Sequence, residues 1–505
     1  MSSYYLGLDQ GTTGTTAMIF DENWNQLARG YKEHAQYYPN PGWVEHDPME
    51  IWRNVLETID MATKEAGISE EELTCIGLDN QGETVMLWDS VSGVPVYNAI
   101  VWQDRRTAEE ADKIAEKYGD MIREKTGLIV DAYFSATKIK WIIDHVKGVK
   151  EKIAQGRIIA GTLDTWMIWK LTHGRTCATD YSTASRTMLL NIHTGQWDEE
   201  ILEILGIPKS ILPEIYDSAK IFGHTDPLDF FGAIVPISGS LVDQQAALFG
   251  QACFKEGMVK TTYGTGCFML MNTGDKPVYS ENGLLTTVGW GLNQGKMTFA
   301  LDGGIYIAGA AVQWLRDKLK IIESAAETEE LAKSVPDTGG VYFVPAFAGL
   351  AAPHWDQYAR GTFVGITGGT GREHIVRATL ESMAYQVKDN LDVMEKDSGI
   401  KIKVMRVDGG ASVNDFLMQF QADILGIPVE VPVITDTTAL GAAYLAAYGI
   451  GQFHDFEELE KNWKRYKRYE PQMDEETREE LLYQWHRAVE RSKEWIETDK
   501  KRKCK

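Results

Sequence analysis

The sequence predicts an α/β fold with two related halves, and three observations support this. Apolar strand-like runs alternate with amphipathic helical stretches such as 48–66, where apolar side chains recur at helical spacing. A unit of strand, glycine- and threonine-containing turn and second strand occurs over 4–20 and again over 258–271. Finally, 505 residues are too many for one hydrophobic core. We therefore expect two domains, 1–250 and 251–505.

The two strand–turn–strand units are built alike. β-prone runs flank a turn in both, with 4–8 and 15–20 around 9–14, and 258–262 and 267–271 around 263–266. The repetition is loose, but it indicates two halves that face each other across a site.

The second half continues with a strand over 404–407 that ends in Asp408-Gly409-Gly410. A helix follows, and we expect Asn414 to cap its start and Gly426 to follow its end. The stretch from Asp474 is charged and helical, which predicts a solvated outer helix.

The composition is that of an ordinary globular protein, with 44% hydrophobic and 25% charged residues. The 51 Lys and Arg against 73 Asp and Glu give a formal net charge of −22, which argues against nucleic acid or an anionic membrane as a partner. Five dispersed cysteines without metal-ligand spacing are typical of reduced thiols. No run approaches the roughly 20 apolar residues of a membrane span. These features predict a cytoplasmic protein with no integral membrane segment.

Both turns offer groups that bind phosphate. Asp9-Gln10-Gly11-Thr12-Thr13 and Tyr263-Gly264-Thr265-Gly266 present backbone N–H groups and hydroxyls, and the Asp9 carboxylate is a ligand that Mg²⁺ accepts. Neither is a Walker A loop, because no GxxxxGK[ST] run occurs. Each turn alone also suits an ordinary hairpin, and Asp408-Gly409-Gly410 also suits a simple tight turn. One such turn in each half favours a clamp on nucleotide phosphates.

Asp243 has two readings. It precedes the apolar start of a predicted helix, so its carboxylate could cap that helix. It could instead be the general base that takes a proton from a substrate hydroxyl. Spacing along the sequence leaves both open.

Longer stretches of the chain resemble the FGGY family of carbohydrate kinases, and within it the members that phosphorylate glycerol. The resemblance runs nearly end to end. Its segments are Pro41-Gly42-Trp43-Val44-Glu45-His46-Asp47-Pro48-Met49-Glu50, Tyr97-Asn98-Ala99-Ile100-Val101-Trp102-Gln103, Asp164-Thr165-Trp166, Asp243-Gln244-Gln245-Ala246-Ala247-Leu248-Phe249-Gly250-Gln251, Tyr263-Gly264-Thr265-Gly266-Cys267-Phe268, Val407-Asp408-Gly409-Gly410 and Thr438-Ala439-Leu440-Gly441-Ala442-Ala443-Tyr444.

This resemblance implies two actin-like (ribonuclease H-like) ATPase domains flanking a deep cleft, with 1–250 on the substrate side and 251–505 on the nucleotide side. It implies that Asp243 and Asp9 are the catalytic residues, with Asp243 as the base, and that both carboxylates hold Mg²⁺. The implied polyol site consists of Gly82, Glu83, Trp102, Tyr133, Asp243, Gln244 and Phe268. The implied ATP site consists of Thr12, Thr13, Gly14, Thr265, Gly309, Gln313, Gly410 and Asn414.

The chain departs from this pattern beside the implied polyol site. Gly82 stands before Glu83 where the glycerol-phosphorylating relatives carry an arginine that binds substrate hydroxyls, and Val242 stands before Asp243 where they usually carry glycine. Losing one charge-assisted hydrogen bond costs roughly 1.5–3 kcal/mol, and a glycine at position 82 is expected to leave open space.

The departures leave the substrate open. Glycerol, converted to glycerol 3-phosphate, is expected if another cation reaches Glu83; the alternative is a larger polyol or sugar such as erythritol or xylitol. A non-catalytic actin-fold ATPase switch is a further alternative, against which the intact Asp243 and Trp102 speak. We expect a homodimer or a homotetramer.

Overall fold

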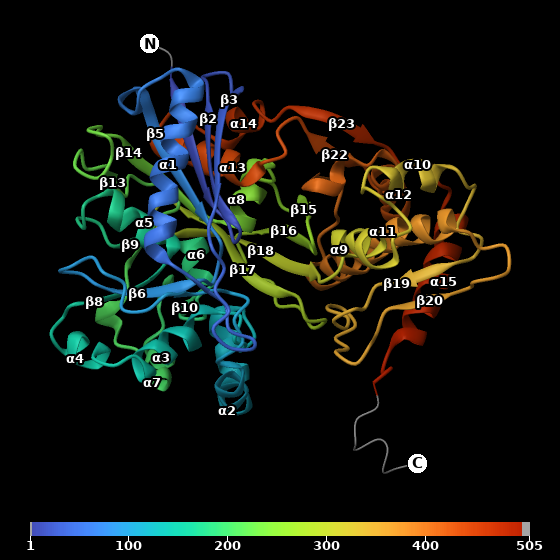
Figure 1. Cartoon of the computed structure of the whole chain (residues 1–505), viewed down its shortest axis with the longest axis horizontal. Coiled ribbons are helices and arrows are strands. Elements are labelled where there is room, and N and C mark those ends of the chain that lie inside the picture. Colours follow the sequence, from blue (N-terminus) through green and yellow to red (C-terminus); the bar gives the residue numbers. More distant parts are fainter. Residues whose placement is uncertain (1–2, 497–505) are drawn as a thin grey trace.

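The computed structural model describes residues 3–496 and contains two large mixed sheets (Figure 1). The first has the strand order β13 (Gly223–His224), β14 (Pro236–Val242), β5 (Leu73–Asn80), β1 (Tyr4–Gln10), β2 (Gly14–Phe20) and β3 (Gln26–Glu33). The second has the order β17 (Leu285–Leu292), β18 (Lys296–Ile305), β16 (Cys267–Gly274), β15 (Val259–Tyr263), β21 (Met405–Asp408), β22 (Val429–Pro432) and β23 (Arg465–Tyr469).

The two sheets share one five-stranded topology. In the first, β3, β2 and β1 form an antiparallel meander, and β5 and β14 then add in parallel. In the second, β18, β16 and β15 form the meander, and β21 and β22 add in parallel. The repeated unit expected from the sequence is therefore confirmed, and the fold is the expected pair of actin-like, ribonuclease H-like units.

Smaller sheets and helices surround these units. A four-stranded sheet contains β4 (Glu45–His46), β7 (Ala99–Ile100), β6 (Val85–Asp89) and β8 (Ile158–Thr162). Three strand pairs are β9 (Ala178–Asp180) with β12 (Glu214–Tyr216), β10 (Leu190–Asn191) with β11 (Gln196–Trp197), and β19 (Tyr342–Val344) with β20 (Thr362–Val364). The α-helices are α1 (Pro48–Ala66), α2 (Ala108–Thr126), α3 (Ser135–His145), α4 (Val149–Ala154), α5 (Leu163–Leu171), α6 (Tyr181–Ser185), α7 (Glu199–Leu205), α8 (Asp243–Gly250), α9 (Gly309–Trp314), α10 (Glu327–Lys333), α11 (Arg372–Ser398), α12 (Asp415–Leu425), α13 (Thr437–Gly449), α14 (Phe456–Glu460) and α15 (Glu475–Ser492). None of the helices within 3–496 is long and apolar enough to cross a membrane.

Local helix signals were read correctly at two places. Helix α1 spans the predicted residues, begins with a proline after the capping Asp47, and ends at Gly67 in the left-handed conformation. Helix α12 begins where Asn414 accepts a hydrogen bond from the Leu417 amide, and Gly426 ends it with φ 70°. The expectation for α15 was wrong in part, because that helix is charged outside but buries an apolar face.

Helices α8 and α13 lie between the two sheets, although α13 comes late in the chain (Figure 1). A row of three glycines, Gly7, Gly77 and Gly239, crosses adjacent strands of the first sheet in register. A Cβ atom on Gly7 or Gly77 would lie 2.0 or 1.9 Å from a backbone oxygen of α13, at Ala439 or Ala442. We call these residues the glycine row; it lets the helix backbone lie directly on the sheet.

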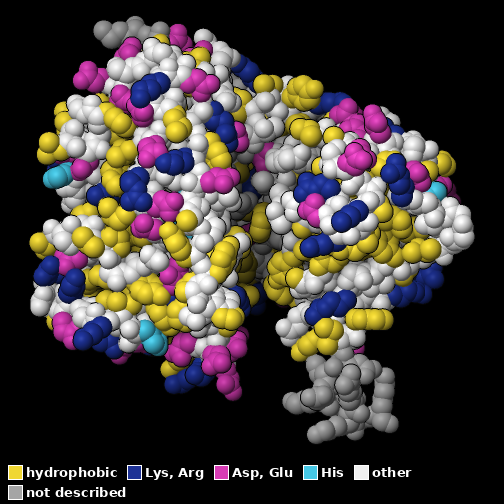
Figure 2. All heavy atoms as spheres, viewed as in Figure 1, with side chains coloured by type: hydrophobic (Ala, Val, Ile, Leu, Met, Phe, Trp, Pro, Cys, Tyr) yellow, Lys and Arg dark blue, Asp and Glu magenta, His cyan; other side chains and the backbone are white. Residues whose placement is uncertain are grey.

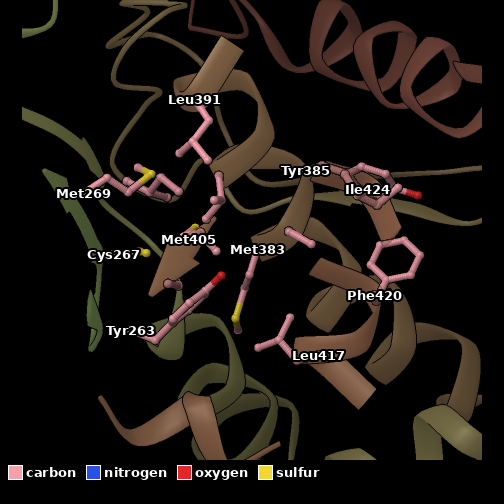
Figure 3. Close-up of a cluster of buried hydrophobic side chains, with 14 of the residues drawn as sticks. Tyr263, Cys267, Met269, Met383, Tyr385, Leu391, Met405, Leu417, Phe420 and Ile424 are labelled. Carbon is pink, nitrogen blue, oxygen red and sulfur yellow. The ribbon is translucent and has the colours of Figure 1, made fainter. Parts of the chain in front are cut away.

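The halves form two lobes with a groove between them on the face that Figure 2 shows. The second lobe has its own core, in which the residues around the second turn are enclosed. Figure 3 shows Tyr263 beside Met383 of α11 and Leu417 of α12, with Tyr385 and Phe420 farther along the same cluster. This packing fixes the position of the second turn relative to its sheet.

Candidate active site

Asp9 lies at the end of β1, where the first sheet meets the start of α13. Thr438 donates a hydrogen bond of 2.6 Å from its hydroxyl to Asp9 Oδ2. Asp79 on β5 lies opposite Asp9 in the strand register and is fully buried. Within residues 3–496, no group meets the geometric criteria for a hydrogen bond to either of its carboxyl oxygens. Burial and the nearby charges of Asp9 and Asp243 raise the pKa of Asp79 well above its usual range. Burial also raises the pKa of Asp9, and hydrogen bonds from Thr438 and from a neutral Asp79 act in the opposite direction.

The first turn is tight, with the Gly11 amide donating to the Gly14 carbonyl at 2.9 Å. Thr13 is exposed and Thr12 is half-buried. Gly14 has a packing role, because a Cβ atom there would lie 2.6 Å from the Lys32 carbonyl oxygen. The turn therefore presents Thr12 and Thr13 to the outside of the sheet.

Trp102 joins the two sites that were predicted separately. Its indole Nε1 donates to the Thr12 hydroxyl at 2.8 Å, and its ring lies edge-to-face against Tyr133 at 5.7 Å between centroids. A side chain expected in the polyol site thus also donates to a hydroxyl of the first phosphate turn.

Asp243 is the first residue of α8 and is not its cap, which is Val242. The capping alternative is therefore wrong. Its Oδ1 accepts from the Gln244 amide at 2.7 Å. Burial, followed by the charge of Glu83, raises the pKa of Asp243 to about 7. A carboxyl group with a pKa near the working pH suits a general base.

Glu83 is buried in the turn after β5 and adopts a left-handed backbone conformation with φ 60°. Such a conformation is rare for a residue with a side chain and often occurs at functional sites. Its Oε1 accepts from Arg186 Nε at 2.6 Å, and Arg186 Nη1 lies 3.1 Å from Asp302 Oδ2. A cation therefore does reach Glu83, which is the condition under which the sequence predicted glycerol as the substrate.

The space expected beside Gly82 is not open. A Cβ atom on Gly82 would lie 2.7 Å from Val242 Cγ2, so the valine fills the volume that the glycine leaves. This corrects the expectation of an enlarged pocket at this position. The two departures noted in the sequence compensate each other sterically.

Gln244 and Phe268 complete the predicted polyol residues. Lys260 of β15 donates to the Gln244 side-chain oxygen and, at 3.1 Å, to the Thr262 hydroxyl. Phe268 on β16 is 36% exposed, an unusual exposure for a phenylalanine, and its ring lies next to Gly304. Gln244 comes from the first half of the chain and Phe268 from the second half.

The predicted nucleotide residues of the second half gather at the second turn. The Gly309 amide donates to the Gly264 carbonyl, and a Cβ atom on Gly309 would lie 2.5 Å from that oxygen. Two amides near the start of α9 donate to the Thr265 carbonyl, each at 3.0 Å. Gln313 is exposed further along α9.

Gly410 and Asn414 lie at the end of the neighbouring strand. Gly410 is exposed at the start of a short 3₁₀ turn, Gly410–Val413. Asn414 caps α12 through its oxygen, while its amide donates to the Thr328 hydroxyl at 3.2 Å. The cap accounts for Asn414 structurally, and a contact with nucleotide is a further role that stays a prediction.

The donor set suits Mg²⁺ held jointly by protein and phosphate. Asp9 and Asp243 offer carboxylate oxygens near enough to influence each other's charge. Within 3–496, no group of three or more His, Cys, Asp or Glu is arranged to hold a metal ion alone. Mg²⁺ usually takes one or two carboxylates together with substrate phosphates, so these residues fit it.

Sequence reasoning missed four residues of this site, namely Arg186, Lys260, Asp302 and Thr438 as a partner of Asp9. Arg186 follows α6, a hundred residues away from Glu83 along the chain. Nothing in its local sequence marks it. Thr438 lies in a segment that had been singled out only for its resemblance.

Comparison with known proteins places this geometry in context. Models of the N- and C-terminal domains of the FGGY family of carbohydrate kinases match residues 4–250 and 259–450. The chain is 60% identical to glycerol kinase 2 of Thermotoga maritima, over 97% of this chain and 99% of that one. It is 57% identical to a glycerol kinase of Caldanaerobacter subterraneus subsp. tengcongensis, over 98% and 100%. A solved Plasmodium falciparum glycerol kinase with ADP matches with a TM-score of 0.93 and 39% identity, covering 98% of this chain and 99% of that one.

Proposed function

Since the chain belongs to the FGGY family of carbohydrate kinases, we propose that it transfers the γ-phosphoryl group of ATP to a terminal hydroxyl of glycerol. The products are glycerol 3-phosphate and ADP. The observation that carries this proposal is the half-buried Asp243 at the start of α8, with a pKa raised to about 7 by desolvation and then by the charge of Glu83.

The reaction proceeds as a direct transfer. The oxygen of a terminal hydroxyl forms a bond to the γ-phosphorus as the bond from that phosphorus to the bridging oxygen of ADP breaks. Asp243 accepts the hydroxyl proton. Glu83, with Gln244, holds the remaining hydroxyls, and the rings of Trp102 and Phe268 line the carbon chain. Most of the rate comes from positioning and electrostatics.

The nucleotide lies across both turns in this proposal. Thr12, Thr13 and Thr265 approach the phosphates, while Gly309, Gln313, Gly410 and Asn414 surround the rest of the nucleotide. Asp9 and Asp243 hold Mg²⁺, which when bound neutralises phosphate charge. Trp102 donates a hydrogen bond to Thr12, so a polyol packed against Trp102 also restrains the first phosphate turn.

A substrate panel tests the proposal. Purified protein is assayed for ADP release with glycerol, erythritol and xylitol, and the phosphorylated product is identified by mass. We expect glycerol to give the highest kcat/KM, because Arg186 supplies a cation and Val242 fills the space beside Gly82. A preference for a four- or five-carbon polyol would favour the larger-substrate alternative. ATP hydrolysis unaffected by any polyol would favour the switch.

Three further expectations remain proposals. We propose domains 1–250 and 251–505, a cytoplasmic location and a homodimer or homotetramer. Light scattering on the purified protein distinguishes the two assemblies from each other and from a monomer. Limited proteolysis tests the boundary near residue 250.

A further inference from the structure

We propose that Arg186 is the substrate-binding cation of the polyol pocket. It holds Glu83 through Nε and donates from Nη1 to a substrate hydroxyl. This inference rests on the proposed function and names a specificity-determining residue for the same site.

The hydrogen-bonding state of Arg186 points to a missing partner. Its side chain is 6% exposed, and Nε is fully engaged with Glu83 at 2.6 Å. Nη1 lies 3.1 Å from Asp302 Oδ2 but makes no hydrogen bond within the described residues. A buried N–H group that is ion-paired but makes no hydrogen bond is left partly unsatisfied. A polyol hydroxyl next to Glu83 and Asp302 would supply the acceptor.

The surroundings of Arg186 belong to the polyol pocket. Its guanidinium carbon lies 5.9 Å from the centroid of the Tyr133 ring and 5.5 Å from that of Phe134. Tyr133 in turn contacts Trp102. Arg186 therefore lies among the side chains that were assigned to the polyol, with carboxylates on two sides and aromatic rings on another.

Gly82 and Val242 pack against each other beside the stem of the Arg186 side chain. A Cβ atom on Gly82 would lie 2.7 Å from Val242 Cγ2 and 3.9 Å from Arg186 Cγ. A Cβ atom at position 82 would collide with the valine and come into ordinary contact with the stem of the arginine. With glycine at position 82, Val242 and Arg186 both keep their positions without a steric clash.

The first test compares two buried arginines of the same half. Arg186→Met is expected to raise the KM for glycerol about 10- to 150-fold, the effect of one charge-assisted hydrogen bond, while the KM for ATP changes little. The control is Arg106→Met. Arg106 is fully buried and pairs with Glu45 and Asp104, outside the pocket. Both variants are expected to lose stability, but only Arg186→Met should weaken glycerol binding.

The second test is a rescue in the Arg186→Met background. Adding Gly82→Arg with Val242→Gly returns a guanidinium to the side of Glu83 and removes the collision, so the KM for glycerol should recover at least about tenfold. Gly82→Arg without Val242→Gly should not rescue. Should Arg186→Met not fold, Arg186→Lys gives the same readout, since a lysine cannot reproduce both contacts.

The outcomes separate this inference from the proposed function. If wild type does not phosphorylate glycerol, the proposed function fails and the KM comparison is made on the polyol that it does use. The inference is overturned if wild type is active and Arg186→Met leaves the polyol KM unchanged. It is also overturned if Arg106→Met raises that KM equally.

Discussion

The two sheets have the same topology but meet the helices between them in different ways. In the first sheet, Gly7 and Gly77 lie two residues before the strand-end pair Asp9 and Asp79. At the same place in the second sheet lie Lys260 and Arg406, two residues before Thr262 and Asp408. The glycines of the first sheet allow its backbone to contact the backbone of α13. In the second sheet, long cationic side chains reach from the strands to the neighbouring helix.

The bridging side chains contact the region of α8. Arg406 donates to the Ala252 carbonyl at 3.1 Å, just beyond the end of α8, and Lys260 donates to Gln244 within it. Such contacts through long side chains adapt to small displacements, whereas the glycine row does not. The first sheet is thus in direct backbone contact with α13. The second sheet contacts α8 through side chains, both these cations and apolar residues such as Leu270 and Trp290.

The largest expected effect separates the chemistry of the two halves. Asp243→Asn should lower kcat about 10²- to 10⁴-fold, because the general base is lost, while ATP binding is nearly retained. Asp408→Asn is the comparison variant in the second sheet, where Gln251 and Thr437 hydrogen-bond to Asp408 Oδ2, each at 2.7 Å. It should change kcat less than about tenfold. Steady-state kinetics with titration calorimetry of ATP checks both, and near wild-type turnover of folded Asp243→Asn would exclude it as the base.

Two buried carboxylates, one in each half, should respond to pH in opposite directions. Burial raises the pKa of Asp164 to about 6, even though Thr162 and Thr179 donate to it. Burial also opposes the charge of Asp389, but hydrogen bonds from His354 and His486 outweigh it and hold that pKa below its usual range.

The sign follows from which state binds the proton more tightly. Asp164 contributes stability that is present below about pH 4 and lost as pH rises through 6. Urea unfolding should therefore show Asp164→Asn gaining about 2 kcal/mol relative to wild type between pH 4 and pH 7. Asp389 contributes stability at neutral pH that is lost as pH falls through its lowered pKa, so the deficit of Asp389→Asn should shrink in acid. Parallel curves for the two variants would contradict the assignment.

The glycine row predicts a smaller but specific loss of stability. Gly77→Ala places a Cβ atom 1.9 Å from the Ala442 carbonyl oxygen, and overpacking of this kind typically costs about 1–3 kcal/mol. Gly119→Ala is the matched control, because Gly119 lies within α2 with nothing within 4 Å of its Cβ position. It should instead stabilise by about 0.5–1 kcal/mol. Thermal unfolding measures both, and equal effects would mean that α13 yields easily.

The smallest effect concerns two consecutive threonines at the start of α13. Thr438 donates to Asp9 of the first sheet and Thr437 to Asp408 of the second. Thr438→Val should lower kcat about 2- to 10-fold, the effect of one hydrogen bond of about 0.5–1.5 kcal/mol. Thr437→Val should leave kcat nearly unchanged and affect mainly stability. A larger kcat loss for Thr437→Val would show that the second sheet takes a direct part in transfer.

Much of this molecule could be predicted from local sequence, because turns, caps and glycines act over a few residues. The cap at Asn414 and the stop at Gly426 were predictable for that reason. The burial of Trp485 on α15 was not, because its indole donates to Asp389, almost a hundred residues earlier. A helix with a charged average composition can still bury one face.

The site divides in the same way. Asp9 and Asp243 lie at element ends, where sequence patterns are informative. The partnership of Glu83 with Arg186 depends on how distant segments meet in space, and so does the position of Val242 in the volume beside Gly82. A single sequence could show that Gly82 was unusual, but only coordinates could show what occupied the adjoining volume.

The glycine row also has a consequence for how the protein is made. Residues 7 and 77 emerge early during synthesis, whereas the helix that covers them spans Thr437–Gly449. The first sheet therefore waits, with one apolar face uncovered, until nearly nine-tenths of the chain has left the ribosome. Uncovered strands of a nascent chain are prone to aggregate. We expect the first half expressed alone to be insoluble, and its solubility to return when a separate segment containing α13 is supplied.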